Sequence, residues 1–163
     1  MTRKVFYSFH YKNDAWRSSQ VRNIGTVEGN KPASDNDWET VKNKGDTAIE
    51  KWIDKQMKGR SCIVVLVGEK TAGREWIKHE IKKGWKSKKG VLGIQIHKLK
   101  DSDKNQSNEG KNPFDNFTIG DKKMSSIVRL KKPSQSTSSG VYDHIKENIE
   151  DWIEEAINIR NKN

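Results

Sequence analysis

Cysteine and long apolar runs are both scarce in this 163-residue sequence. The one cysteine, Cys62, excludes a disulfide framework and gives no ligand spacing for zinc, so we expect a buried, inert thiol. The longest strongly apolar run, 62–67, is far shorter than the ~20 residues that cross a bilayer. The N-terminal residues lead directly into a strand-like segment with no cleavable hydrophobic stretch. The sequence therefore predicts a cytoplasmic protein with no membrane segment and no metal site.

Hydrophobic residues are also scarce, at 31%, whereas charged residues make up 33% and give a net charge of +10. The length fits a single domain, 1–163, whose core must come from a few concentrated segments. The positive charge would attract phosphates, nucleic acid or acidic partners. Lysine outnumbers arginine 25 to 7, however, and bidentate readout of bases prefers arginine. We therefore interpret the charge as mainly solubilising and do not expect a nucleic-acid partner.

Apolar periodicity divides the chain into alternating strands and helices. Continuous or branched apolar runs predict buried strands, and apolar residues recurring every three or four positions predict helices. Polar stretches rich in Gly, Pro, Ser or Asn between them predict loops. The expected strands are 4–10, 62–67, 91–96 and, more weakly, 127–130; the expected helices are 16–23, 46–57, 74–87 and 141–160; the expected loops are 25–36, 100–125 and a flexible joint at 133–140.

This alternation predicts an α/β fold, a three-layer sandwich with a central, mainly parallel sheet and helices on both faces. Ligands of such sheets bind outside the carboxyl ends of the strands, where the strand order reverses. The rule directs attention to 8–11, 68–73 and 96–98. Common phosphate-binding and hydrolase motifs are absent, and His79-Glu80 is only half of a zinc-protease motif because Lys83 replaces its second histidine.

Two segments resemble the motifs of TIR domains. Lys4 to Asp14, KVFYSFHYKND, resembles the first TIR box, in which an apolar strand ends in Ser-aromatic and is followed by polar residues and an Asp. Ile63 to Gly68, followed by Trp76-Ile-Lys-His-Glu80, resembles the TIR strand that leads into a helix bearing Trp-x-x-x-Glu. With Val21-Arg22-Asn23 and Asn112-Pro113-Phe114-Asp115, the chain is most similar to the TIR-like proteins of the bacterial Thoeris anti-phage system, the ThsB type.

The resemblance implies a flavodoxin-like, TIR-like fold and a role in anti-phage defence. It implies that NAD is consumed as a substrate, with no other cofactor, to make a cyclic ADP-ribose-type signal for a partner effector protein. Ordinary TIR domains carry an Arg-Asp and Pro-Gly loop after the second strand, whereas 25–38 has a different composition. Because that loop commonly mediates contacts between TIR domains, the mode of self-association stays open.

Glu80 is the candidate catalytic residue. On a helix it shares a face with Trp76, four residues earlier. Breaking the bond between ribose and nicotinamide builds positive charge on the sugar, which one carboxylate would stabilise. The nicotinamide ring of NAD is cationic and departs as a neutral molecule. It therefore needs no proton from an acid, and a single Glu suffices. By resemblance, Glu80 occupies the catalytic position of NAD-cleaving TIR domains; the alternative is a solvated residue paired with Lys83.

The candidate substrate-binding residues lie beside the first strand and on the Glu80 helix. An aromatic side chain at a strand end stacks on nicotinamide or adenine, and a histidine there meets phosphate. Alternatively, Phe9 is a core residue and His10 a capping or surface residue, and Arg22 and Asn23 are an ordinary surface pair instead of pyrophosphate ligands. Trp76 is expected to shape the pocket by packing. The candidates are Ser8, Phe9, His10, Tyr11, Arg22, Asn23 and Trp76.

Three functions stay open at this point. The preferred hypothesis is an NAD-cleaving enzyme that recloses or transfers the ADP-ribose. The second is a non-catalytic TIR-like module that assembles with a partner protein. The third is a basic phosphate- or nucleic-acid-binding domain, whose binding would weaken steeply with salt.

Overall fold

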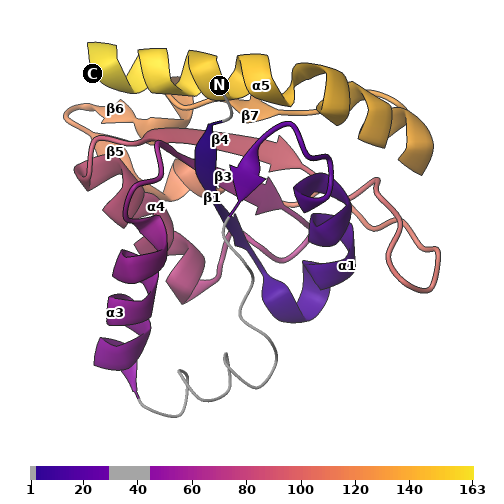
Figure 1. Ribbon diagram of the computed structural model, residues 1–163, viewed down its shortest axis with the longest axis horizontal. Helices are drawn as coiled ribbons and strands as arrows, with labels where there is room; N and C mark the ends of the chain where they lie inside the picture. The colour runs from indigo at the N-terminus through magenta and orange to yellow at the C-terminus, as the bar shows by residue number, and fades with distance from the viewer. Residues whose placement is uncertain (1–2, 30–44) are drawn as a thin grey trace.

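A five-stranded parallel sheet forms the centre of the computed structural model, which describes residues 3–29 and 45–163 (Figure 1). The strand order is β2-β1-β3-β4-β7, and every pairing between neighbours is parallel. This is the flavodoxin-like order, so the predicted α/β fold class is confirmed. The strands are β1 (Lys4–Phe9), β2 (Glu28–Gly29), β3 (Cys62–Val67), β4 (Gly90–Gln95) and β7 (Leu130–Lys131).

Helices cover both faces of the sheet (Figure 1). The connection from β1 to β2 runs in one direction across the sheet, and the connections from β2 to β3 and from β3 to β4 run in the other. Because such connections are right-handed, the helix of the first connection and the helices of the other two lie on opposite faces. α1 and α5 pack on one face, and α3 and α4 pack on the other. The helices are α1 (Tyr11–Arg22), α3 (Asp46–Met57), α4 (Glu75–Lys86) and α5 (Ser138–Lys162).

The strand β3 explains how few hydrophobic residues suffice for the core. All six of its residues are buried, because helices cover both of its faces. Val64 and Leu66 join the cluster under α1 and α5, while Ile63 and Val65 join the cluster under α3 and α4. Cys62 is fully buried in the first cluster and has no disulfide partner, as expected for an inert thiol. Apolar residues are concentrated where two layers meet, and charged residues remain for the surface.

Helix boundaries match the predictions where an apolar stripe defines them. The helix predicted at 46–57 is α3, with the same bounds. The helix predicted at 16–23 begins five residues earlier, because its first turn has no apolar stripe and Asp14 departs from helical geometry (φ −123°, ψ 16°). The last helix begins at Ser138, three residues before the predicted start, because the Thr137 side chain accepts a hydrogen bond from the Gly140 N–H.

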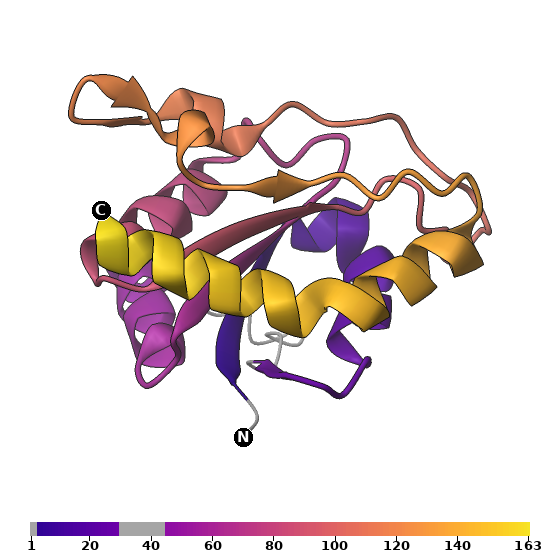
Figure 2. The same cartoon turned by 90° about the horizontal axis from the view of Figure 1, so that it is seen from above.

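The stretch predicted as a loop at 100–125 contains short elements of its own. Buried Phe114 and Met124 attach it to the core under α3 and α4. Figure 2 shows this segment running along one side of the molecule to the hairpin of β5 and β6. The weak strand predicted at 127–130 is only partly right, since β7 begins at its last residue. The short elements are η1 (Pro113–Asn116), β5 (Thr118–Ile119), β6 (Lys122–Lys123) and η2 (Met124–Ser126).

The predicted joint 133–140 lies against the loop that follows β4. Gln106 Nε2 donates a hydrogen bond to the Ser136 carbonyl (2.9 Å), and the Lys100 N–H donates to Ser138 Oγ (3.0 Å). The flexibility of this joint stays a prediction. Residues 30–44, which include most of the predicted loop at 25–36, lie outside the described residues. Across the described ranges, no helix is long and apolar enough to cross a membrane.

Candidate functional site at the carboxyl edge of β1 and β3

The strand order reverses between β1 and β3, so their carboxyl ends flank the position where such folds bind ligands. β1 and β3 are in register from Val5 opposite Cys62 to Phe9 opposite Leu66. The residues after β1 therefore lie beside the β3–α4 loop, residues 68–74. The predicted segments 8–11 and 68–73 meet at one edge of the sheet.

Glu80 is a buried carboxyl on the apolar face of α4. Ile77 and Ile81 anchor that face to the sheet, and a Cβ on Gly84 would collide with Ile63, so glycine lets α4 approach β3 closely. Glu80 itself is only 6% exposed. Lys83, its alternative partner, instead pairs with Asp54 (Nζ to Oδ1, 3.0 Å). The interpretation of Glu80 as a solvated, paired helix residue is therefore wrong.

Ser8 is the polar group that acts on Glu80. Burial raises the pKa of Glu80 to about 8, and the Ser8 hydroxyl opposes this rise. Ser8 is 1% exposed, and neither its Oγ nor Glu80 Oε2 has a hydrogen-bond partner among the described residues. The hydroxyl thus lies close to the carboxyl without a well-aligned hydrogen bond. With this raised pKa the carboxyl is mostly protonated at neutral pH. Once ionised, it can stabilise a positive charge that enters beside it.

Trp76 lies one turn before Glu80 and is half-buried against the core under α3 and α4. Its ring makes an edge-to-face contact with His79, with 5.4 Å between ring centroids. The Nε2 atom of His79 is buried and has no hydrogen-bond partner among the described residues. The packing of Trp76 agrees with the expectation that it shapes the site.

Phe9, His10 and Tyr11 follow Ser8 out of β1. Phe9 is partly buried under α1 and α5, and its ring centroid is 6.0 Å from that of Tyr11. Its side chain thus lies on the other face of the sheet from Ser8, because successive strand residues alternate. His10 is half-buried. Burial lowers its pKa, and the charges of Arg74 and Lys70, among others, lower it further. His10 is therefore close enough to Lys70 in the β3–α4 loop and to Arg74 for their charges to affect it.

Arg22 and Asn23 are not brought together with Glu80. Arg22 ends α1 and Asn23 caps it, twelve residues from the helix start at the site edge. Arg22 is half-buried beside Tyr7 and Tyr11, and burial lowers its pKa. Asn23 is exposed. Both belong to the face covered by α1, whereas Glu80 lies on the face covered by α4. Their predicted contact with pyrophosphate stays a prediction.

Asp14 and Arg17 form a second buried polar group that the sequence did not reveal. Arg17 Nη1 donates to Asp14 Oδ1 (3.2 Å), and both side chains are almost fully buried. Arg17 also donates to the carbonyls of Leu99 (2.8 Å) and Asn105 (2.9 Å). Arg17 thereby ties the loop after β4 to α1. In the sequence, Asp14 and Arg17 look like an ordinary surface ion pair because they are three residues apart. The carbonyls that Arg17 also binds lie 82 and 88 residues away along the chain, so the sequence gives no sign of them.

Gly68 directly follows the last residue of β3 and lies against the Asp14 carboxyl. A Cβ on Gly68 would collide with the Asp14 carboxyl, and a Cβ on Gly110 would collide with the Gly68 carbonyl. Two glycines therefore let α1, the β3–α4 loop and the loop after β4 meet closely. Gln95 Nε2 donates to the Gly110 carbonyl (3.1 Å), and Gln95 Oε1 lies 3.3 Å from His97 Nδ1, so Gln95 links His97 to the loop that carries Gly110.

The described residues contain no group of three or more His, Cys, Asp or Glu side chains placed to hold a metal ion. The chemistry available at this edge is therefore that of a buried carboxyl, a neighbouring hydroxyl and nearby cations.

Comparisons with known proteins agree with this architecture. The family described as "Thoeris protein ThsB, TIR-like domain" matches residues 6–101, a span that includes most of β1 and all of β3 and α4, with Glu80. The chain is also 33% identical over 120 residues to a Bacillus cereus (strain MSX-D12) protein named "Putative cyclic ADP-D-ribose synthase ThsB1". That match covers 71% of this chain and 62% of the length of the Bacillus protein. The chain belongs to the TIR-like domain family of Thoeris ThsB proteins.

Proposed function

We propose that this chain cleaves the bond between nicotinamide and ribose in NAD and releases a cyclic ADP-ribose-type signal for an effector protein in anti-phage defence. The family and the name of the Bacillus relative support this activity. The observation that carries the proposal is Glu80 at the edge where the strand order reverses, a carboxyl that is 6% exposed and has no counter-charge in residues 3–29 and 45–163.

Glu80 would act through its charge. As the C–N bond breaks, its electron pair leaves with neutral nicotinamide, and the ribose carries the positive charge. An ionised carboxylate in a water-poor site stabilises that charge more strongly than it would in water. A hydroxyl or ring nitrogen of the same ADP-ribose then attacks the cationic carbon. Attack by a hydroxyl releases its proton. Attack by an adenine ring nitrogen, which carries no hydrogen, gives a cationic base that becomes neutral when the exocyclic amino group loses a proton. Attack by water also releases a proton and gives linear ADP-ribose instead.

The site residues have separate proposed roles. Ser8 would hold the Glu80 carboxyl toward the ribose by hydrogen bonding once that carboxyl is ionised. Trp76 would wall the pocket, and Phe9 or Tyr11 would stack on a base. NAD would enter as a substrate, with no resident cofactor, and the product would be the diffusible partner of the effector. Self-association of TIR-like domains would assemble the active form.

The test measures nicotinamide release from NAD and separates cyclic from linear ADP-ribose by chromatography. It compares wild type with Glu80→Gln, using protein alone and protein mixed with lysate of phage-infected cells as a source of the activating cue. We expect the variant to lose activity by roughly 10²–10³-fold, the usual cost of removing one charge-stabilising group. Glu75→Gln is the matched control, because Glu75 is exposed on the same helix. Equal turnover by Glu80→Gln would refute the catalytic role, and no turnover by wild type in either condition would favour a non-catalytic interaction module.

A further inference from the structure

Three cationic residues lie in the segments that follow β1 and β3, at the same edge of the sheet as His10. Lys12 lies in the first turn of α1, Lys70 in the β3–α4 loop, and Arg74 immediately before α4. The charges of all three act on His10. None of the three forms an ion pair with a residue of the described ranges. Like charges held together without a counter-charge repel one another until an anion enters.

Two helices begin at this cluster, and both break the usual capping rule. The N-cap of α1 is His10 and that of α4 is Arg74, and neither helix start has a side-chain cap. The first N–H groups of a helix lack partners and carry partial positive charge, so Ser, Thr, Asp and Asn are preferred there. α5 follows the rule with Thr137. Lys12 in the first turn of α1 and Arg74 at the N-cap of α4 place a positive charge at each of these helix starts, a local conflict of the kind found at functional sites.

Unpartnered polar atoms at the same edge are an independent sign of a ligand. The Ser8 hydroxyl is buried and has no hydrogen-bond partner in the described part of the chain, although it ends the same strand that leads to His10. His10 Nδ1 is also buried without a partner. Buried polar groups are normally paired, so each exception needs an explanation. Oxygen atoms of a bound anion would supply the missing partners.

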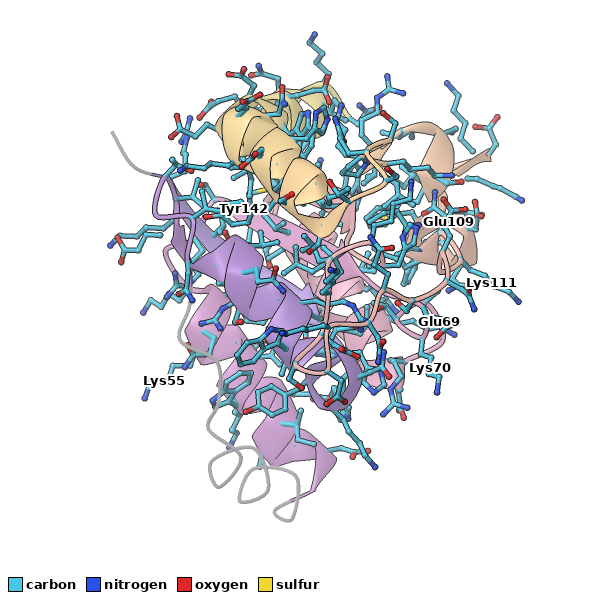
Figure 3. The ribbon with its side chains drawn as sticks, turned by 90° about the vertical axis from the view of Figure 1, so that its right-hand side faces the viewer. Lys55, Glu69, Lys70, Glu109, Lys111 and Tyr142 are labelled. Atoms are coloured by element: carbon cyan, nitrogen blue, oxygen red, sulfur yellow. The ribbon has the colours of Figure 1, made fainter. Side chains whose placement is uncertain are left out.

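Glu69, the acidic neighbour of Lys70, is hydrogen-bonded to the loop after β4. Figure 3 shows Glu69 and Lys70 beside Glu109 and Lys111, where the β3–α4 loop meets the loop after β4. Asn108 Nδ2 donates to Glu69 Oε1 (2.8 Å), which holds this carboxylate toward the loop after β4. Glu69 is thus held by that loop, and it forms no ion pair with Lys12, Lys70 or Arg74.

We propose that Lys12, Lys70 and Arg74, together with His10, bind the diphosphate of the dinucleotide substrate. The proposal rests on the proposed function, because Glu80 and Ser8 then mark the ribose position. His10 follows Ser8 by two residues, about 7 Å along an extended strand, a spacing that suits a ribose and its 5′-phosphate. The cluster provides the pyrophosphate contact that the sequence assigned to Arg22 and Asn23.

Binding of ADP, measured by titration calorimetry, tests this site without requiring turnover. The test variant is Lys70→Ala/Arg74→Ala. The control is Lys51→Ala/Lys55→Ala, which has the same net charge as the test variant. It removes two exposed lysines of α3 that form no ion pair within the described ranges. We expect the test variant to bind ADP about tenfold or more weakly, as two charge-assisted contacts would predict, and to bind adenosine as wild type does. The control should bind ADP like wild type, and added salt should weaken wild-type binding more than binding by the test variant.

Activity separates this inference from the proposed function. If NAD is cleaved, the test variant should raise KM about tenfold and leave kcat nearly unchanged, because the diphosphate contact is present before and during the reaction. NAD cleavage with equal ADP affinity in wild type and test variant would overturn the diphosphate site alone. Equal losses in test and control variants would also overturn it, since they would show only non-specific attraction. Cluster-dependent ADP binding without NAD cleavage would keep the anion site and refute the proposed function.

Discussion

Asp14 and Glu80 are buried carboxyls at the same edge of the sheet, and among the described residues only Asp14 has a counter-charge. Asp14, on the α1 side, contacts Arg17 and is hydrogen-bonded by Arg17 and Asn13. Glu80, on the α4 side, has only the Ser8 hydroxyl. Burial raises the pKa of both, but Arg17 and Asn13 oppose the rise at Asp14. A paired buried charge is explained by the architecture, whereas an unpaired one points to a ligand.

The surroundings of the two carboxyls support this distinction. Through Arg17, Asp14 connects α1 to carbonyls of the loop after β4, so it stabilises the wall of the site. Glu80 forms no ion pair within the described ranges, and α4 places it among apolar side chains at a cost in folding free energy. A residue that costs stability and forms no structural contact is a strong functional candidate. The difference predicts opposite effects for mutations at the two positions.

Arg17→Ala should cause the largest loss of stability. It removes the cation from a buried ion pair and leaves Asp14 uncompensated, which typically costs about 3–5 kcal/mol. Thermal unfolding should then shift down by roughly 6–20 °C for a domain of this size. Arg129→Ala, at an exposed arginine, is the control and should unfold like wild type. A melting temperature of Arg17→Ala equal to that of the control would remove the distinction between the two carboxyls.

Glu80→Gln should do the opposite and stabilise the protein at alkaline pH. The folded-state pKa of Glu80 is about 8, raised from 4.5. The protonated carboxyl therefore contributes its full stability below pH 4.5, and this contribution is lost as the pH rises through about 8. Glutamine stays neutral, so we expect the variant to gain roughly 2–4 kcal/mol over wild type at pH 9 and nothing at pH 4.5. Denaturant unfolding at the two pH values measures this, and a pH-independent difference would contradict the uncompensated burial of Glu80.

The rate of NAD cleavage should rise with pH, because the carboxylate and not the neutral acid stabilises the cationic ribose. With a pKa of about 8 in the free protein, kcat/KM should increase about tenfold per pH unit below 8 and level off above it. Steady-state kinetics from pH 6 to 9 check this, with Glu75→Gln expected to keep the same profile. A rate that is flat over this range would mean that Glu80 is already ionised in the free protein.

The fold was predictable where burial leaves a regular pattern. The run 62–67 is β3, and the three- and four-residue spacing at 46–57 is α3, because their apolar residues face layers on known sides. The start of α1 and the two-residue β7 were not, since neither has enough apolar residues to set a period. The family motifs, Lys4 to Asp14 and Trp76 to Glu80, can be recognised in the sequence alone, and the family match agrees with them.

The site was predictable only in part, for a physical reason. Spacing put Glu80 on the face of Trp76, and topology put Ser8 at the same edge. The burial of Glu80, however, depends on how closely α4 lies on β3, which requires Gly84 against Ile63. Arg17 became visible only through carbonyls 82 and 88 residues away along the chain. Contacts of such long range leave no periodic signal in one sequence.

The exposed ion pair between α3 and α4 gives the smallest effect and sharpens the comparison of the buried carboxyls. Asp54 and Lys83 are as well placed as Asp14 and Arg17, at 3.0 Å and 3.2 Å, but their side chains are 48% and 39% exposed. Water already solvates both charges, so Lys83→Ala should cost less than about 1 kcal/mol in denaturant unfolding. Added salt should reduce this difference further, because it screens exposed charges and leaves the Arg17→Ala effect largely intact. A loss at Lys83 as large as that at Arg17 would show that ion-pair distance, and not burial, decides which carboxyls need a partner.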